Sequence, residues 1–371
     1  MGATPQLASA PPSPAVATPL ASHLAAGDNP PPLLPYRGAL TPAAITGAGA
    51  ELAALAASAG VYDLGYFALL QISGNDRLRW LNGMVTNTIQ SLEEGLSNYS
   101  FLLNAQGRIL GDATIYRFSD HLLLETDRNQ IAKLATHLDH FTIMDEVELH
   151  PLDASFTALG IAGPRSEEIL RGLGLTPPAE DAFVRGEING VEVMLVHAHS
   201  PVVPHFELWL PAESLPSIWS TLINAGAVPC GVSAVESLRI LTATPLYGID
   251  IQERHLAQET SQSRALNFNK GCYLGQEIVE RIRSRATIHR ALRQFSLTGN
   301  PPALEPGQTI PLNAEQAERN PVGELTSVAQ YQLPAFTGVL ALGFIRTEIL
   351  ERKASITYSE GTATPLDAPP L

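Results

Sequence analysis

One loop decides how the chain is interpreted, and it reads Asn269-Lys270-Gly271-Cys272-Tyr273-Leu274-Gly275-Gln276-Glu277. It combines a thiol, an ammonium, an amide and a carboxylate with two glycines, which permit backbone conformations and close approaches that other residues resist. Lys270 is expected to raise the thiolate fraction of Cys272. A lone cysteine is more often a small buried apolar residue, but these polar neighbours favour presentation at the surface. The loop is therefore predicted to be a functional site with Cys272 as its reactive group, Lys270 assisting ionisation and Gln276 or Glu277 orienting the loop.

The composition indicates a protein of two or three domains, because 371 residues are too many for one typical core. No apolar run approaches the roughly 18 residues that cross a bilayer, so no membrane partner is expected. A formal net charge of −14 disfavours general affinity for phosphate backbones, so direct DNA binding is not expected. Cys230 and Cys272 are the only cysteines. Two cysteines are too few for a disulfide framework or for a protein-only four-cysteine cluster. No metal site is predicted. A reducing cytoplasm is the expected location.

The first half of the chain alternates between predicted helices and strands. Residues 1–48 are rich in proline and alanine and carry few charges, so they are predicted to be a disordered tail. Order is predicted to begin with a helix over 51–59 and a strand over 61–72. A β-hairpin is predicted from strands 98–103 and 109–118, which are joined by Asn104-Ala105-Gln106-Gly107-Arg108.

The second half continues this mixture and ends in strands. Asp127 and Gln130 resemble a capping box for a helix that ends near residue 140. A second unit of strands and helices is predicted to begin near Ser155. After Thr287, short strand-like pieces separated by glycine and proline are typical of a small barrel. Strands and helices mixed at this density predict an α+β fold.

These motifs resemble the folate-binding YgfZ family, a branch of the superfamily of the glycine-cleavage T-protein, over roughly residues 60–350. The resemblance depends mainly on Lys270-Gly271-Cys272-Tyr273-x-Gly275-Gln276-Glu277. The upstream landmarks are Leu238-Arg239, Tyr247-Gly248-Ile249-Asp250 and Glu259-Thr260. Further matches are Tyr99-x-x-Leu102-Leu103-Asn104-x-x-Gly107, Ala162-Gly163-Pro164 and Val322-Gly323-Glu324-Leu325-Thr326-Ser327.

The resemblance implies a three-domain ring, as in the glycine-cleavage T-protein, around a hole that receives tetrahydrofolate or a derivative. Residues 49–152 plus 232–286 are expected to form a discontinuous first domain that binds folate. Residues 153–231 are expected to form a second α+β domain, and residues 287–371 a C-terminal β-barrel.

The resemblance also implies particular ligand contacts. Tyr99, Asp112 and Tyr116 correspond to residues of the folate cavity, and Glu207 and Arg239 to its polar anchors. Glu207 suits the amino-pyrimidinone edge of a pterin, and tyrosine rings offer stacking faces. The planar fork of Arg239 suits the carboxylates of the glutamate tail of folate.

Each of these residues also has an ordinary structural interpretation. Tyr99 and Tyr116 are equally well described as strand aromatics without the resemblance. Glu207 then becomes a solvated strand residue, and Arg239 pairs with Glu236 three positions earlier on a helix.

The function implied by the resemblance depends on one departure from the family. True aminomethyltransferases have an adjacent acidic pair where this sequence has Gly111-Asp112. With folate binding retained and a thiol added, the resemblance implies a factor that supports iron–sulfur cluster assembly or repair. Cys272 would act as nucleophile, redox partner or transient ligand, and iron–sulfur client or assembly proteins would be the partners.

Two alternatives belong to other functional classes. The first is a tetrahydrofolate-dependent aminomethyltransferase or demethylase, in which Asp112 orients or deprotonates the folate nitrogen. The second is an accessory role in tRNA modification, which follows if cluster-bearing modifying enzymes are the clients.

Overall fold

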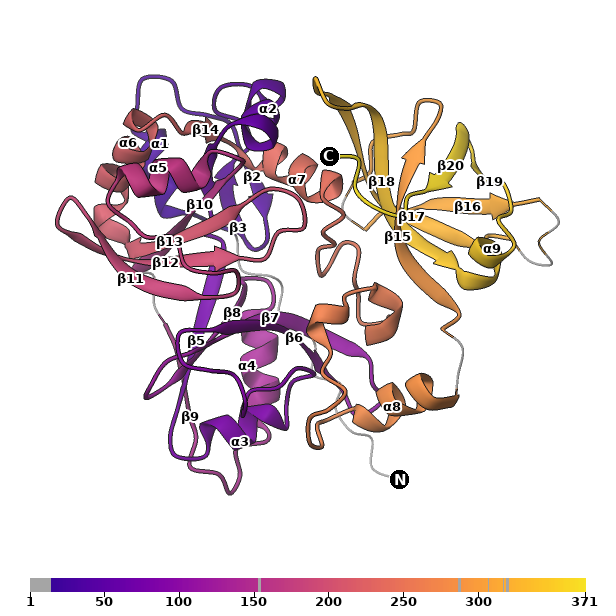
Figure 1. Cartoon of the computed structure of the whole chain (residues 1–371), viewed down its shortest axis with the longest axis horizontal. Helices are drawn as coiled ribbons and strands as arrows, with labels where there is room; N and C mark the ends of the chain where they lie inside the picture. The colour runs from indigo at the N-terminus through magenta and orange to yellow at the C-terminus, as the bar shows by residue number, and fades with distance from the viewer. Residues whose placement is uncertain (1–14, 153–154, 286–287, 306, 316, 318–319) are drawn as a thin grey trace.

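The protein is built from three bodies, which Figure 1 shows at the lower left, upper left and right. The computed structural model describes residues 15–152, 155–285, 288–305, 307–315, 317 and 320–371. The predicted α+β fold with a C-terminal β-barrel is confirmed. Among the described helices, none is long and apolar enough to span a bilayer.

The first body is an antiparallel five-stranded sheet in the order β6-β7-β8-β5-β9. Its core contains Leu70, Trp80, Ile115 and Leu134, because alternate strand residues face the helices. The strands are β5 (Phe67–Ser73), β6 (Ser97–Leu103), β7 (Ile109–Arg117), β8 (Leu122–Asp127) and β9 (Glu148–Pro151), and the helices are α3 (Arg77–Asn82) and α4 (Ile131–Asp139).

The second body is a six-stranded sheet in the order β11-β12-β13-β10-β4-β14. Leu159, Leu170 and Trp219 belong to the core on its helix-covered face. The strands are β4 (Gly60–Asp63), β10 (Phe156–Ala162), β11 (Phe183–Ile188), β12 (Val191–Ala198), β13 (His205–Pro211) and β14 (Val228–Cys230). The associated helices are α2 (Ala48–Ala57), α5 (Ser166–Gly172), η1 (Ala212–Ser214), α6 (Leu215–Asn224) and α7 (Val232–Leu241).

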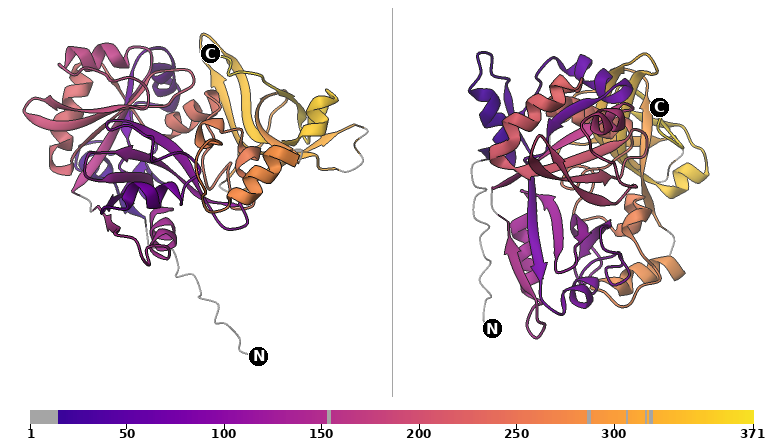
Figure 2. Two further views of the ribbon diagram at one scale, coloured as in Figure 1. Left: turned by 60° about the horizontal axis from the view of Figure 1, so that its bottom comes forward. Right: turned by 60° about the vertical axis from the view of Figure 1, so that its left-hand side comes forward.

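The third body is a closed barrel in the order β15-β18-β17-β16-β19-β20, which both views of Figure 2 place beside the two sheets. Its elements are β15 (Arg290–Leu297), β16 (Ile310–Ala314), β17 (Gly323–Gln332), β18 (Thr337–Arg346), α9 (Thr347–Glu351), β19 (Ile356–Tyr358) and β20 (Gly361–Pro365). A segment with η2 (Ala257–Thr260), η3 (Ser263–Ala265) and α8 (Gln276–Arg285) precedes the barrel.

The prediction that residues 1–48 form a disordered tail is wrong for residues 15–48, which contain helix and strand. Residues 1–14 lie outside the described part of the chain. This segment forms β1 (Val16–Ala17), α1 (Pro19–Ala25), β2 (Leu33–Tyr36) and β3 (Ala39–Pro42). Leu20 is fully buried, and the hydroxyls of Thr18 and Thr41 donate to the buried carboxylate of Asp63. Long-range burial therefore orders a sequence whose composition is typical of disorder.

The single strand predicted over 61–72 is in fact two strands that belong to different sheets. β4 pairs with β10 in the six-stranded sheet, and β5 pairs with β8 in the five-stranded sheet. Residues 64–66 connect β4 to β5 and so lead the chain from the six-stranded sheet to the five-stranded sheet. The chain enters the six-stranded sheet twice, at β4 and again at β10 after the expected boundary at residue 153. A continuous apolar run carries no signal for the first change of sheet.

A buried ion pair joins α7 to the barrel. Arg239 Nη1 donates to Asp250 Oδ2 at 2.7 Å, and Asp250 is fully buried. The other carboxylate oxygen accepts from the hydroxyls of Thr326 and Ser327 on β17, at 2.5 and 2.7 Å. The backbone N–H of Leu246 donates to Oδ2 at 2.9 Å. A buried charge is tolerated when it is paired and hydrogen-bonded, so one carboxylate fixes α7, the following loop and the barrel together.

We expect Asp250→Asn to lower the free energy of unfolding by about 3 kcal/mol, because it leaves Arg239 without its buried counter-charge. Urea unfolding measures the change. Asp367→Asn is the matched control, since Asp367 is exposed near the end of the barrel domain, and it should change stability by less than about 0.5 kcal/mol. Equal stability of the two variants would contradict a joining role for Asp250.

Candidate functional site

A cavity of about 230 Å³ lies where the two sheets meet α7 and the segment before the barrel. The predicted ligand-binding residues come from four separate elements, β6, β7, β13 and α7, and the fold brings all of them to its wall. They are Tyr99, Asp112, Tyr116, Glu207 and Arg239. Their binding role remains a prediction.

Asp112 on β7 is held in place from two sides. Its Oδ2 accepts from the Tyr99 hydroxyl at 2.6 Å, and its Oδ1 accepts from Gln130 Nε2 at 2.8 Å. The backbone N–H of Asp112 donates to Gln130 Oε1 at 3.1 Å. Gln130 therefore orients this carboxylate and makes no capping hydrogen bond at α4, so the predicted capping box is wrong. Asp112 is a fixed hydrogen-bond acceptor on the cavity wall.

The dipeptide Gly111-Asp112 stands where an adjacent acidic pair was expected, and Gly111 is the member that lacks a carboxylate. A Cβ at this position would approach Gln130 Oε1 to 2.7 Å and Leu134 Cδ2 to 2.8 Å. Position 111 therefore faces α4, because neighbouring strand residues point to opposite faces. Asp112 is the member of this dipeptide that reaches the cavity.

Arg37 also lines the cavity, although the sequence analysis placed it in the tail. It forms an ion pair with the buried Asp127 and lies 5.0 Å from the ring centroid of Tyr66. Burial raises the pKa of Asp127 to about 6, and the Arg37 guanidinium opposes this shift. The available signal in the sequence was the isolation of this cation within a nearly uncharged segment.

Glu207 lines the cavity, and a second buried carboxyl group, that of Glu125, lies outside the lining but within electrostatic reach of Glu207. Trp209 Nε1 donates to Glu207 Oε2 at 2.9 Å, and the Tyr116 hydroxyl donates to Glu125 Oε2 at 2.7 Å. Burial raises the pKa of Glu207 to about 7. Burial, reinforced by the charge of Glu207, raises the pKa of Glu125. Near neutral pH Glu207 can therefore accept or donate a hydrogen bond toward a ligand. The sequence analysis did not identify Glu125.

Arg239 lines the cavity, but its guanidinium N–H groups already donate to acceptors of the protein. In addition to Asp250, its Nε donates to Glu236 at 2.8 Å and its Nη2 donates to Ser327 Oγ at 3.0 Å. The i,i+3 pairing with Glu236 is confirmed. Two carboxylates neutralise this guanidinium, so its geometry favours a structural clamp over a free ligand anchor.

Arg264 is an unpaired cation at the exposed part of the cavity. Its guanidinium lies 4.2 Å from the ring centroid of Tyr99. Its side chain makes no hydrogen bond or ion pair with any described residue. The sequence analysis missed it, because nothing in its local sequence distinguishes it from a surface arginine.

The cysteine loop lies outside the lining of this cavity. Cys272 is exposed, as predicted, and Gln276 and Glu277 open α8. Lys270 Nζ donates to the carbonyls of Asn82, Val85 and Asn87, each at 2.6 Å.

An ammonium has three donors, so these three carbonyls engage all of them and Lys270 anchors the loop to this segment. Its assistance to the ionisation of Cys272 remains a prediction. Burial lowers the pKa of Lys270 to about 7.

Of the two loop glycines, the structure requires one. Gly275 has φ 82°, and a Cβ there would lie 2.7 Å from the carbonyl oxygen of Asn104. A Cβ at Gly271 would meet nothing within 4 Å. Gly275 therefore allows the loop to pack against the turn of the β6–β7 hairpin.

The fold and the cavity together define a three-body protein with a cavity lined by its two sheets, by α7 and by the segment before the barrel. The GCVT N-terminal domain family model matches residues 35–270, and the chain belongs to this family. The match includes the cavity residues from Arg37 to Arg264.

Curated relatives named aminomethyltransferase match part of this chain. The aminomethyltransferase of Thermoanaerobacter pseudethanolicus is 26% identical over 229 residues, which is 59% of this chain and 62% of the relative. The aminomethyltransferase of Halalkalibacterium halodurans is 29% identical over 240 residues, or 62% of this chain and 66% of the relative. The chain thus spans less than two thirds of these two relatives.

A solved structure matches nearly the whole fold. The glycine cleavage system aminomethyltransferase T from Bartonella henselae has a TM-score of 0.82 and covers 95% of this chain and 96% of its own. The sequence identity is 19%, so this likeness shows the fold. The predicted resemblance to the T-protein superfamily is confirmed.

The first functional prediction, support of iron–sulfur cluster assembly or repair, is wrong. The relatives are named aminomethyltransferases, and the matching solved structure is an aminomethyltransferase. The position of Cys272 outside the cavity agrees with this correction.

The raised pKa of Glu207 predicts a pH-dependent stability. The folded protein holds this proton up to about pH 7, whereas an unfolded glutamate releases it near pH 4.3. Stability from the protonated carboxyl is therefore fully present below about pH 4 and is lost as the pH rises to 7. Relative to Glu207→Gln, the wild type should lose up to about 3 kcal/mol between pH 4 and 8.

Urea unfolding of both proteins across this pH range measures the difference. The exposed Glu213→Gln in η1 is the control, and its difference from the wild type should not change with pH. A pH-independent difference for Glu207→Gln would show that folding does not raise the pKa of Glu207.

Proposed function

We propose that this protein is a tetrahydrofolate-dependent one-carbon transferase of the aminomethyltransferase type. The observation that carries the proposal is Asp112, a carboxylate fixed by Tyr99 and Gln130 on the wall of the cavity. The names of the relatives and the family support the same class. Within the superfamily, we place the chain in the YgfZ branch on its loop motif, Lys270 to Glu277.

The cavity residues fit the chemistry of a reduced folate. The oxygen of Glu207 that is not bonded to Trp209 is available for the amino-pyrimidinone N–H groups of a pterin. Tyr99 and Tyr116 line the same space with aromatic surface.

Arg264 supplies the free cation that a glutamate tail requires. Its exposed position suits a tail that leads out to solvent, and its planar fork matches carboxylate oxygens. Since the donors of Arg239 are committed to protein acceptors, we assign the tail to Arg264 and a supporting role to Arg239.

In such a transfer, tetrahydrofolate supplies the nitrogen that receives the one-carbon unit. Asp112 is placed to accept the proton that this nitrogen gives up, or to orient the nitrogen by accepting its hydrogen bond. Tyr99 and Gln130 hold both carboxylate oxygens, so the acceptor is positioned before the ligand arrives.

We expect Asp112→Asn to reduce transfer at least 100-fold, because an amide cannot accept the proton. The assay uses the glycine-cleavage proteins with their own aminomethyltransferase omitted and this protein supplied in its place. It follows methylenetetrahydrofolate formed from glycine. Calorimetric titration with tetrahydrofolate should give the same affinity for both proteins within about threefold.

The exposed Asp139→Asn on α4 controls for a general effect of removing a charge, and it should retain full transfer. Wild-type binding without turnover would contradict the transferase function while leaving the folate site intact. Full activity in Asp112→Asn would remove Asp112 from the mechanism.

We expect Arg264→Gln to weaken tetrahydrofolate binding about tenfold, because it removes a charge-assisted hydrogen bond to the tail. The melting temperature should change little, since the side chain of Arg264 makes no hydrogen bond or ion pair with a described residue and its contact with the Tyr99 ring is at an exposed site. Calorimetry with tetrahydrofolate and with tetrahydropterin, which has no tail, measures the effect. An equal loss of affinity for both ligands would contradict the assignment of the tail to Arg264.

A further inference from the structure

A second pocket, of about 150 Å³, lies where the chain crosses from one sheet to the other. β4 pairs with β10 from Leu159 to Ala162, and the chain then turns away through residues 64–66 into β5. The turn leaves a wedge between β5 and the beginning of β10. We call this space the wedge pocket, and its lining comprises Leu64, Gly65, Phe67, Ala68, Leu69, Arg128, Leu152, Phe156, Thr157, Ala158 and Trp209.

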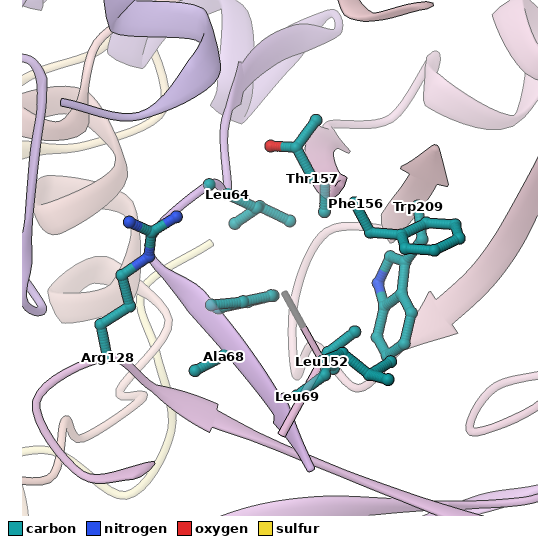
Figure 3. Close-up of a pocket in the computed structure, with 11 residues that line it drawn as sticks. Leu64, Ala68, Leu69, Arg128, Leu152, Phe156, Thr157 and Trp209 are labelled. Carbon is teal, nitrogen blue, oxygen red and sulfur yellow. The ribbon is translucent and has the colours of Figure 1, made fainter. Parts of the chain in front are cut away.

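The walls of the wedge pocket are mainly apolar. Figure 3 shows the rings of Phe156 and Trp209 at one side, with Leu69 and Leu152 below them. Phe156 is 52% exposed, so part of its apolar surface is open to solvent beside the wedge pocket. These walls suit the aromatic or branched apolar body of a small molecule.

Arg128 places a cation opposite these rings (Figure 3). Its guanidinium makes no hydrogen bond or ion pair with any residue that the structure describes. The carboxylate of Asp63 acts on it electrostatically but is already bonded to the hydroxyls of Thr18 and Thr41 and to the N–H of Gly65. Arg128 therefore has five donors available to an anion.

Thr157 adds an unsatisfied polar atom to the same lining. Its residue is 8% exposed, and its Oγ1 is buried without a hydrogen-bond partner. In Figure 3 the hydroxyl oxygen is directed toward the side on which Arg128 lies. A buried hydroxyl without a partner is unfavourable, so a ligand acceptor near Arg128 would satisfy both groups.

We propose that the wedge pocket is a second ligand site, distinct from the main cavity, for a small carboxylate with an aromatic or branched apolar body. Arg128 binds the carboxylate and the rings of Phe156 and Trp209 hold the body. This site goes beyond the proposed transferase function and does not depend on it.

The wedge pocket is adjacent to the main cavity. Leu64 and Phe67 line both spaces. Trp209 donates to Glu207 and packs against Tyr116 with ring centroids 4.8 Å apart. The indole of Trp209 therefore lines the wedge pocket and also contacts two residues of the main cavity. An experiment on the wedge pocket has to show that a ligand binds there and not in the main cavity.

The test compares phenylacetate with phenylacetamide, which has the same shape but no charge, by calorimetry on the full-length protein. We expect phenylacetate to bind at least about tenfold more tightly, because a charged hydrogen bond is worth more than a neutral one. Arg128→Gln should abolish this preference. Arg185→Gln, at an exposed paired arginine on β11, should preserve it.

Two further measurements separate this site from the main cavity and from surface binding. Saturating tetrahydrofolate should not displace phenylacetate, and Ala68→Leu, which fills the wedge pocket from β5, should weaken both probes at least tenfold. Displacement by tetrahydrofolate, unchanged preference in Arg128→Gln, unchanged binding in Ala68→Leu, or no binding of phenylacetate to the wild type would each overturn the proposal.

Discussion

The attachment of the barrel to α7 depends on the buried pair between Arg239 and Asp250. A carboxylate without solvent is stable only when cations and donors surround it, and those partners come from α7, from the loop after α7 and from the barrel. Glu236 completes the neutralisation of Arg239 and accepts from the Tyr36 hydroxyl at 2.5 Å. The cavity wall is therefore tied to the barrel and to the N-terminal segment through one charged cluster.

Similar carboxyl groups around the cavity have different environments and different uses. Asp112 accepts hydrogen bonds on both oxygens and suits a role as a fixed acceptor. Asp127 is buried against Arg37. Glu207 and Glu125 are buried near one another, and low polarity favours their protonated forms. The position of each carboxyl relative to cations and donors, rather than its residue type, decides whether it carries charge at neutral pH.

Much of the fold could be predicted from the sequence, because the hairpin after Tyr99 and the barrel strands have clear local patterns. Five residues predicted by resemblance do meet at one cavity. The remaining features depend on distant contacts. The order of residues 15–48 depends on burial against Asp63, and the role of Lys270 depends on three carbonyls in the segment 82–87. The roles predicted for the other loop residues remain predictions.

The N-terminal segment has a consequence for how the protein is made. Tyr36 and Arg37 line the cavity together with residues as distant as Arg264. During synthesis these early residues leave the ribosome long before the partners that enclose the space. The Arg37–Asp127 pair can form midway, but the wall closes only after α7 and residue 264 have emerged. The cavity is therefore incomplete on a nascent chain until Arg264 has left the ribosome, so the space can form only after both sheets have been synthesised.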